Sequence, residues 1–128
     1  MSNKQILNTE NAPAAIGPYN QAVLAGNTLY VSGQIPLIPE TMELVNSGVA
    51  DETHRVLKNV EAILTHAGYT FNDVVKASIF IADMGDFATI NEVYAQYFTE
   101  NQPARECVAV KTLPKNVNVE ISVIAWKG

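Results

Sequence analysis

Side chains that build metal sites and nucleophilic pairs are scarce in this sequence. Its 128 residues include one cysteine, Cys107, and two histidines, His54 and His66. A single cysteine excludes an internal disulfide and fits a reducing compartment, so we expect a cytoplasmic protein. No spacing among these three residues is typical of a zinc site or a Cys-His pair. We therefore expect no metal and no cofactor.

Long apolar runs and basic clusters are also missing. No run approaches the roughly 18 apolar residues that a membrane helix requires, and residues 1–19 lack the apolar segment of a signal peptide. Eight basic and 13 acidic residues give a net charge of −5, and the basic residues are scattered. We therefore expect neither a membrane nor a nucleic acid as partner.

The sequence indicates one folding unit. No repeat, linker or low-complexity stretch interrupts it, so residues 1–128 are predicted to form a single domain. A chain of this length buries about two-thirds of its unfolded surface, which is enough for a hydrophobic core. Apolar periodicity and turn residues predict the order β-β-β-α-β-α-β-β. The approximate ranges are 3–8, 19–25, 28–34, 49–67, 73–83, 86–98, 105–113 and 117–126.

Local signals support several of these boundaries. Gly26 and Asn27 form a hairpin turn signal, Gly68 is placed to end the first helix, and Asp86 is a plausible N-cap of the second. Both helices carry one apolar stripe. Two helices for one sheet predict an α/β fold of the α+β two-layer sandwich type, in which a mixed β-sheet carries both helices on one face. The other face would then be left uncovered by this chain.

Side chains alternate across a strand, so position parity assigns each one to a face. The row of the last strand expected to face the helices is Val117, Val119, Ile121, Val123 and Ala125, and the opposite row is Asn118, Glu120, Ser122, Ile124 and Trp126. In the preceding strand the corresponding rows are Val108 and Val110, and Arg105, Cys107, Ala109 and Lys111. Arg105, Cys107 and Glu120 are therefore predicted to share the open face, with Ser32 a candidate neighbour.

The residues alone leave the roles on this face open. A mixture of apolar and charged side chains is typical of a subunit interface in a closed oligomer. Arg105 is either a solvated charge, an ion pair with Glu120, or a fork that binds a carboxylate while Glu120 serves as a base. Cys107 has no histidine partner, because both histidines fall off the helical stripe and are expected on the surface. A buried small residue is thus favoured over a nucleophile.

Four segments resemble the reactive intermediate deaminase (Rid) family, also called the YjgF family, in its RidA branch of 2-iminobutanoate/2-iminopropanoate deaminases. They are "APAAIGPYNQAV", "YVSGQIP", "VVKASIFIADMGDFATINEVYAQYF" and "PARECVAVKTLPKNVNVEI". Together they cover nearly the whole chain in the family's order. The most specific part is Pro-Ala-Arg followed by the cysteine and the final "VEI" strand.

The resemblance implies a chorismate-mutase-like fold and a homotrimer whose sheets form a central barrel, with sites between subunits. It implies an enzyme of metabolite damage control that hydrolyses reactive 2-imino acids to 2-oxo acids and ammonia. The implied catalytic residues are Arg105 as carboxylate ligand, Glu120 as activator of water and Cys107 through its backbone. The implied substrate-binding residues are Tyr19, Ser32 and Asn91. Without the resemblance, these last three would be a packing aromatic, a space-filling residue and a surface amide.

Two positions depart from the family's commonest pattern. Glu106 follows Arg105 where a serine is frequent, and Ser122 stands where the final strand often has a second acid. By parity Glu106 points away from Arg105, although its charge could weaken carboxylate capture. The segment before Pro103 is also short, which could alter the rim of a cleft.

Two other functions stay open at this point. One is a non-enzymatic regulatory or chaperone-like trimer on the same fold, since a fold does not fix a function. Arg105 together with Glu120 distinguishes the two, because a pure binder has no need for both. The other is RNA cleavage, a label that some relatives carry. The net charge of −5 and the absence of a histidine pair argue against it.

Overall fold

The computed structural model describes residues 4–128. The strands are β1 (Lys4–Leu7), β2 (Ala22–Ala25), β3 (Thr28–Gln34), β4 (Val74–Ile81), β5 (Ala104–Ala109) and β6 (Val119–Trp126). The helices are α1 (Val49–Ala67) and α2 (Phe87–Ala95), and short 3₁₀ turns occupy Phe71–Asp73, Met84–Asp86 and Pro114–Asn116. The predicted order of elements is confirmed. Residue 3, where the first strand was expected to begin, lies outside the described residues.

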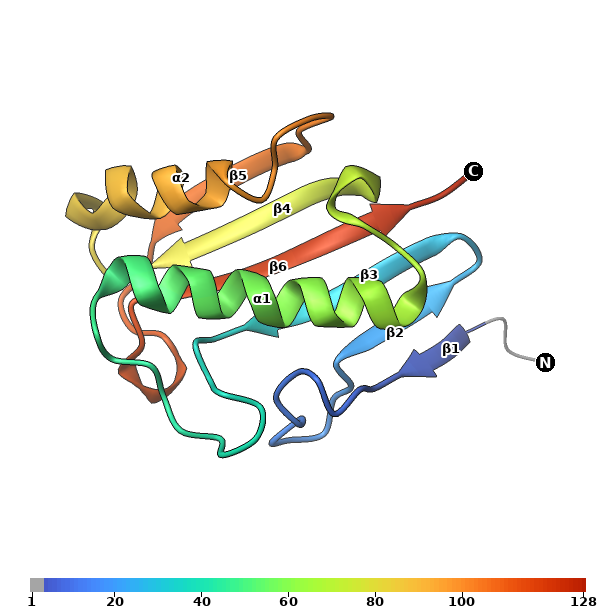
Figure 1. Ribbon diagram of the computed structural model, residues 1–128, viewed down its shortest axis with the longest axis horizontal. Helices are drawn as coiled ribbons and strands as arrows, with labels where there is room; N and C mark the ends of the chain where they lie inside the picture. Colours follow the sequence, from blue (N-terminus) through green and yellow to red (C-terminus); the bar gives the residue numbers. More distant parts are fainter. Residues whose placement is uncertain (1–3) are drawn as a thin grey trace.

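The six strands form one mixed sheet in the order β1-β2-β3-β6-β4-β5. Neighbours are antiparallel except β4 and β5, which are parallel and are connected through α2. Both helices lie on the same face of this sheet (Figure 1). The α+β two-layer sandwich is therefore confirmed. Among residues 4–128, no helix has the length and apolar character needed to cross a bilayer.

The core lies between the helices and the inward row of β6. Val119, Ile121 and Ala125 are fully buried, as predicted, and α1 contributes Val56, Leu57, Val60 and Ile63 to the same cluster. β6 lies between β3 and β4, so the alternation of its side chains determines which face of the central sheet is turned toward the helices. The outward row of β6 is half-buried or exposed, which confirms its predicted orientation. Asn118 is an exception: it precedes β6, and its amide bonds Glu52 of α1 at 2.8 Å.

Boundary signals were right for α1 and partly wrong for α2. Gly68 ends α1 in the left-handed conformation, with φ of 83°, which glycine adopts without steric cost. Asp86 occupies the N-cap position, as predicted, but its side chain makes no capping bond. Instead, the Asp83 carboxylate accepts a bond from the Gly85 amide at 2.8 Å and starts the 3₁₀ turn that leads into α2. The helix is entered one turn earlier than the apolar pattern indicated.

The predicted orientation of β5 is wrong. Arg105 and Cys107 lie in register with Ala77 and Ile79 of β4, whose side chains are buried beneath the helices. Arg105 and Cys107 therefore face the helical layer, while Glu106 and Val108 face the open side. The position-parity argument assigned the wrong face because the open face is itself partly apolar. The apolar row of β5 therefore did not identify the face that the helices cover. Val108 is 44% exposed in this edge strand.

One buried amide ties α1 to the loop that follows β3. Asn59 is fully buried in the middle of α1, and its Nδ2 donates to the carbonyl oxygens of Leu37 at 2.9 Å and Ile35 at 3.3 Å. Its Oδ1 accepts a bond from Arg55 Nε at 3.1 Å. Because a buried carbonyl without a partner is costly, this amide fixes the path of the loop.

We expect Asn59→Ala to lower the free energy of unfolding by about 2 kcal/mol, because the Leu37 carbonyl loses the side-chain donor that it bonds at 2.9 Å and the Ile35 carbonyl keeps only the Leu37 amide. Urea denaturation measures the change. The control is Lys58→Ala, an exposed neighbour on the same helix, which should stay within about 0.5 kcal/mol of the wild type. Equal, small effects of both substitutions would show that the amide does not hold the loop.

Candidate functional site

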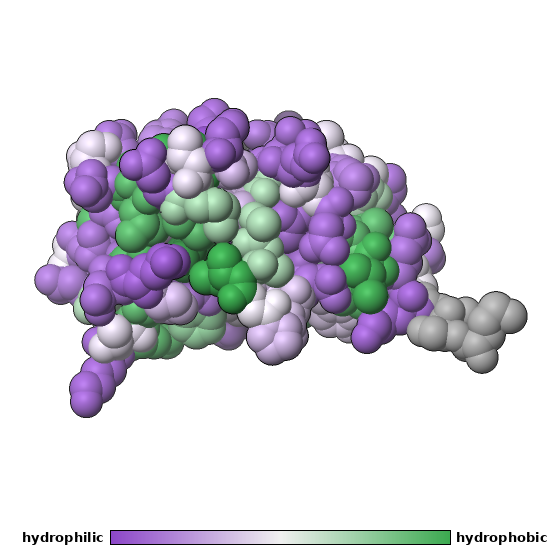
Figure 2. All heavy atoms as spheres, turned by 90° about the horizontal axis from the view of Figure 1, so that it is seen from below, coloured by the Kyte–Doolittle hydropathy of each residue, from purple (hydrophilic) through white to green (hydrophobic). Residues whose placement is uncertain are grey.

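A cavity of about 350 Å³ opens where β3 and β6 meet the loops that follow β1 and β3. Its wall is mostly apolar and is formed by Pro13, Ala14, Ile16, Ile35, Leu37 and Pro114. Apolar atoms gather over the side of the molecule that carries these loops (Figure 2). The polar residues Glu120, Ser32, Gln34, Gln21 and Tyr19 complete the lining. An apolar hollow with a few polar groups is the usual form of a small-molecule site.

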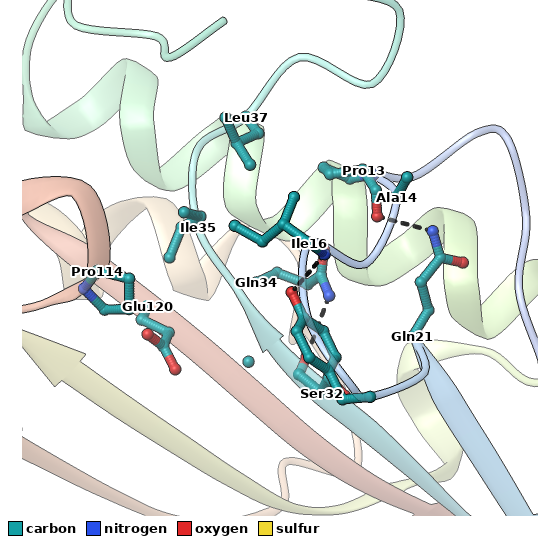
Figure 3. A pocket seen from close by; sticks show the side chains of 12 residues that line it. Pro13, Ala14, Ile16, Gln21, Ser32, Gln34, Ile35, Leu37, Pro114 and Glu120 are labelled. Carbon is teal, nitrogen blue, oxygen red and sulfur yellow. Dashed lines mark hydrogen bonds between the residues drawn. The ribbon is translucent and has the colours of Figure 1, made fainter. Parts of the chain in front are cut away.

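Glu120 supplies the carboxylate of this cavity. It leaves β6 on the face opposite the helices and points into the hollow near Pro114 (Figure 3). Burial raises its pKa. Its carboxylate lies against the backbone of Gly33, where the lack of a side chain leaves room for Glu120 Oε2. Burial makes this carboxylate a stronger proton acceptor than a solvent-exposed one, which is the property that a general base requires.

Ser32 and Tyr19 line the same cavity, and their contact with a substrate stays a prediction. Ser32 Oγ donates to the Asn20 carbonyl oxygen at 2.6 Å, so its hydroxyl hydrogen is already used within the chain. Tyr19 is 48% exposed and lies in the loop before β2, not at a strand start as expected. Its hydroxyl accepts a long bond of 3.4 Å from the Ile16 amide. Tyr19 is therefore held weakly at the mouth of the cavity.

Gln21 is a residue that sequence reasoning missed. Its side chain is 2% exposed. Its Nε2 donates to the carbonyl oxygens of Thr9, Ala12 and Pro13 at 3.0, 3.1 and 2.8 Å, and its Oε1 accepts from the Thr9 amide at 2.6 Å. These bonds fix the loop that forms one wall of the cavity (Figure 3). The only signal in the sequence is a glutamine directly before an apolar strand, which does not reveal its partners.

Arg105 lies in a second group, between β5 and α2. Its Nη1 donates to Asn91 Oδ1 at 2.7 Å. The guanidinium carbon stands 4.9 Å from the ring centroid of Tyr94 and 5.8 Å from that of Phe87. Both distances are within the range of a cation–π interaction. The structure therefore joins the predicted residues Arg105 and Asn91 directly.

Cys107 follows on the same side of β5 and packs against the main core. Burial raises the pKa of its thiol, and the nearby Arg105 charge opposes this only in part. A raised pKa keeps the thiol protonated near neutral pH, which is unfavourable for a nucleophile. β5 pairs with β4 alone among the described strands, so one side of its backbone has no strand neighbour. A contact through the Cys107 backbone stays a prediction.

The carboxylate of Glu106 is bound by two neighbours on the open face. Its Oε1 lies 3.2 Å from Lys76 Nζ, and its Oε2 accepts a bond from Ser78 Oγ at 3.0 Å. The hydrogen bonds from Lys76 and Ser78 hold the pKa of Glu106 below its ordinary value. Because this acid lies on the far side of β5 from the guanidinium, it does not compete for Arg105.

The predicted residues therefore form two groups on opposite faces of one sheet. Tyr19, Ser32 and Glu120 line the cavity, whereas Arg105, Asn91 and Cys107 lie on the helical side. The expectation that Arg105 and Glu120 share the open face is wrong, and so is an ion pair between them within one copy. The cause is the facing of β5, which places its odd-numbered residues beneath α2.

The histidines belong to neither group. His54 is not the exposed surface residue that was expected: its Nδ1 lies 2.8 Å from the Tyr97 hydroxyl and links α1 to α2. His66 is exposed in the last turn of α1. Among residues 4–128, no three His, Cys, Asp or Glu side chains are grouped closely enough to hold a metal ion.

Comparison with known proteins places the chain among close relatives. Residues 9–127 match the family described as Endoribonuclease L-PSP. Human 2-iminobutanoate/2-iminopropanoate deaminase is 47% identical over 125 residues, which are 98% of this chain and 91% of that protein. The crystal structure of the Rid family protein YyfA from Yersinia pestis is 46% identical with a TM-score of 0.94, covering 97% of this chain and 99% of that one. E. coli TdcF with bound serine is 46% identical with a TM-score of 0.92 and the same coverage.

We expect Glu120→Gln to raise the free energy of unfolding at pH 7. The folded-state pKa of Glu120 is raised, so its ionisation costs stability as the pH rises from the unfolded pKa through the folded one. Below the unfolded pKa the carboxyl is protonated in both states, and the advantage of the variant should vanish. Urea denaturation at pH 7 and at about pH 3.5, roughly one unit below the ordinary Glu pKa, measures the difference.

Glu106→Gln is the matched control and should change stability in the opposite direction. The pKa of Glu106 is lowered, so its contribution is present above the unfolded pKa and is lost as the pH falls through the folded one. This variant should be less stable than the wild type at pH 7 and approach it in acid. If Glu120→Gln and Glu106→Gln changed stability in the same direction, the opposite pKa shifts of the two carboxyls would not account for the result.

Proposed function

This chain belongs to the Endoribonuclease L-PSP family, which includes the Rid (YjgF-type) proteins, and on that basis we propose that it hydrolyses reactive 2-imino acids to 2-oxo acids and ammonia. The name of the human relative indicates an imine or enamine deaminase. The proposed substrates are 2-iminobutanoate and 2-iminopropanoate. Each has a carboxylate for recognition and a C=N carbon for attack, and the two groups of residues match these two needs.

Arg105 is the proposed ligand of the substrate carboxylate. Guanidinium binds carboxylate through two parallel hydrogen bonds, which also fixes the orientation of the adjacent imine. Asn91 occupies one donor of Nη1, and the remaining donors of the guanidinium stay available. Arg105 is exposed at the edge of β5, where a ligand can reach it.

Glu120 is the proposed base. It would take a proton from water as the oxygen bonds to the imine carbon and the C=N electron pair moves to nitrogen. Returning this proton to nitrogen gives an amino alcohol. Glu120 would then take the proton of the new hydroxyl as the carbonyl forms, and pass it to nitrogen so that the C–N bond breaks and ammonia leaves. The raised pKa of Glu120 makes it a stronger base, which favours this exchange. Ser32 and Tyr19 in the same cavity are proposed to contact the substrate.

The observation that carries this proposal is the placement of the two groups on opposite faces of the sheet. A small imino acid cannot bridge them within one copy, so we infer that Arg105 of one copy meets the Glu120 cavity of another. The open face carries Tyr30 and Trp126, which are half-exposed aromatic residues and are suited to an interface. A homotrimer with sites between subunits, as the Rid resemblance implies, satisfies this requirement.

The other candidate functions have less support from the geometry. RNA cleavage, the activity in the family's description, has no histidine at either group of residues in the described part of the chain. A purely regulatory binder would not require a carboxylate with a raised pKa in an apolar cavity. Absence of turnover together with a specific bound partner would favour that second role.

We expect Arg105→Ala to lower kcat/KM for 2-iminobutanoate at least about a hundredfold, because two charge-assisted hydrogen bonds are lost. The imine is generated in the cuvette by a threonine dehydratase, and formation of 2-oxobutanoate is followed. Arg105→Lys should retain part of the activity, since it keeps the charge but not the fork. Lys111→Ala, which removes an exposed charge beyond β5, is the control and should leave the rate unchanged. Full activity of Arg105→Ala would disprove the proposed carboxylate binding.

A further inference from the structure

One face of α2 forms a cradle for the Arg105 guanidinium. Phe87, Asn91 and Tyr94 follow one another at four- and three-residue steps, so they lie on the same side of the helix. That side faces β5, where Asn91 accepts the bond from Nη1 and the two rings flank the guanidinium carbon. An arginine side chain has several rotatable bonds, and holding it in one place before a ligand arrives reduces the entropy lost on binding.

Tyr94 is the most rigid part of this cradle. It is 5% exposed. Its ring stacks on Phe98 with centroids 4.2 Å apart and planes at 16°, and Phe98 in turn meets the edge of Phe71 at 4.8 Å. This packing fixes the position of the Tyr94 ring, and the fixed ring limits the positions that the Arg105 guanidinium can take.

The hydroxyl of Tyr94 makes no well-aligned hydrogen bond in this arrangement. It is buried and lies close to Arg105, but no partner among residues 4–128 meets it with hydrogen-bond geometry. Burial raises the pKa of Tyr94, and the charge and close side-chain approach of Arg105 oppose the rise without cancelling it. A buried hydroxyl without a partner destabilises the fold, so the ring, and not the hydroxyl, explains the fit of this residue.

We propose that Tyr94 is a positioning residue for carboxylate recognition, and that it acts through Arg105. Its ring supports the guanidinium from one side, while Asn91 fixes its rotation. In this proposal Asn91 acts on the carboxylate through Arg105. The inference rests on the proposed function only in that the anion to be bound is the carboxylate of a 2-imino acid or of its 2-oxo product.

The test compares Tyr94→Leu with Tyr94→Phe. The probe is 2-oxobutanoate, which carries the same carboxylate as the imine and is stable during a calorimetric titration. Tyr94→Leu removes the ring and should weaken binding roughly tenfold, within the range of a partly desolvated cation–π contact. It should raise KM for the imine by a similar factor and leave kcat nearly unchanged, since Glu120 is untouched. Tyr94→Phe keeps the ring and should restore the affinity to within about twofold of the wild type.

A control separates this role from general damage to α2. Tyr97→Leu removes another ring from the segment after α2, one that contacts His54 and not Arg105. It should lower stability but leave the affinity for 2-oxobutanoate at the wild-type value. Wild-type affinity in Tyr94→Leu would overturn the proposal. Equal losses in Tyr94→Leu and Tyr94→Phe would also overturn it, because the hydroxyl would then be the working group.

A measurement without ligand distinguishes failure of this inference from failure of the proposed function. The Tyr94 ring beside Arg105 should shift the NMR signal of its Nε–H in the wild type and in Tyr94→Phe, and the shift should be smaller in Tyr94→Leu, where only the more distant Phe87 ring remains. If wild-type protein neither binds 2-oxobutanoate nor hydrolyses imines, the proposed function fails, and this pattern still supports the positioning of Arg105 by Tyr94. The same signal in all three proteins would refute the positioning role.

Discussion

The alternation of side chains across the pleated sheet governs what one copy of this chain can do. Arg105 and Glu120, which are proposed to act on one substrate, lie on opposite faces of the sheet. Arg105 extends from β5 toward α2, and Glu120 extends from β6 toward the open side. No side-chain rotation brings them together. Any reaction that needs both must therefore be completed by association, and the partly apolar open face supplies a surface on which association can occur.

Both helices do more than cover the core. Two polar side chains on the buried side of α1 make hydrogen bonds to segments beside the cavity. Asn59 donates to the carbonyl oxygens of Ile35 and Leu37, and Glu52 accepts a bond from Asn118 just before β6. In α2 the inward face carries the group that holds Arg105. Because buried hydrogen bonds are costly to break, these anchors give the loops and the arginine fixed positions on a rigid layer. The same contacts thus support the fold and hold the residues that are proposed to act in catalysis.

Sequence periodicity predicted the elements, their order and the facing of β6, because each depends on strong local apolar patterns. It failed for β5, since Val108 and Val110 suggest a covered row although the open face is apolar as well. It also missed Gln21 and Tyr94. Gln21 bonds backbone atoms of a distant loop, and Tyr94 appeared only as one member of an apolar stripe. The chemistry of Arg105 and Glu120 came from a family resemblance, and only coordinates could reveal that the two residues lie on opposite sides of the sheet.

The central claim is that one active site is built from two copies, and mixing two defective chains tests it most directly. Arg105→Ala and Glu120→Ala chains are each expected to be inactive alone in imine hydrolysis. When they are refolded together in equal amounts, roughly a quarter of the interfaces in a cyclic oligomer should join an intact Arg105 to an intact Glu120 on its neighbour. The account predicts recovery of about that fraction of wild-type activity. Activity no greater than that of the separate variants, in oligomers shown by mass to contain both chains, would contradict it.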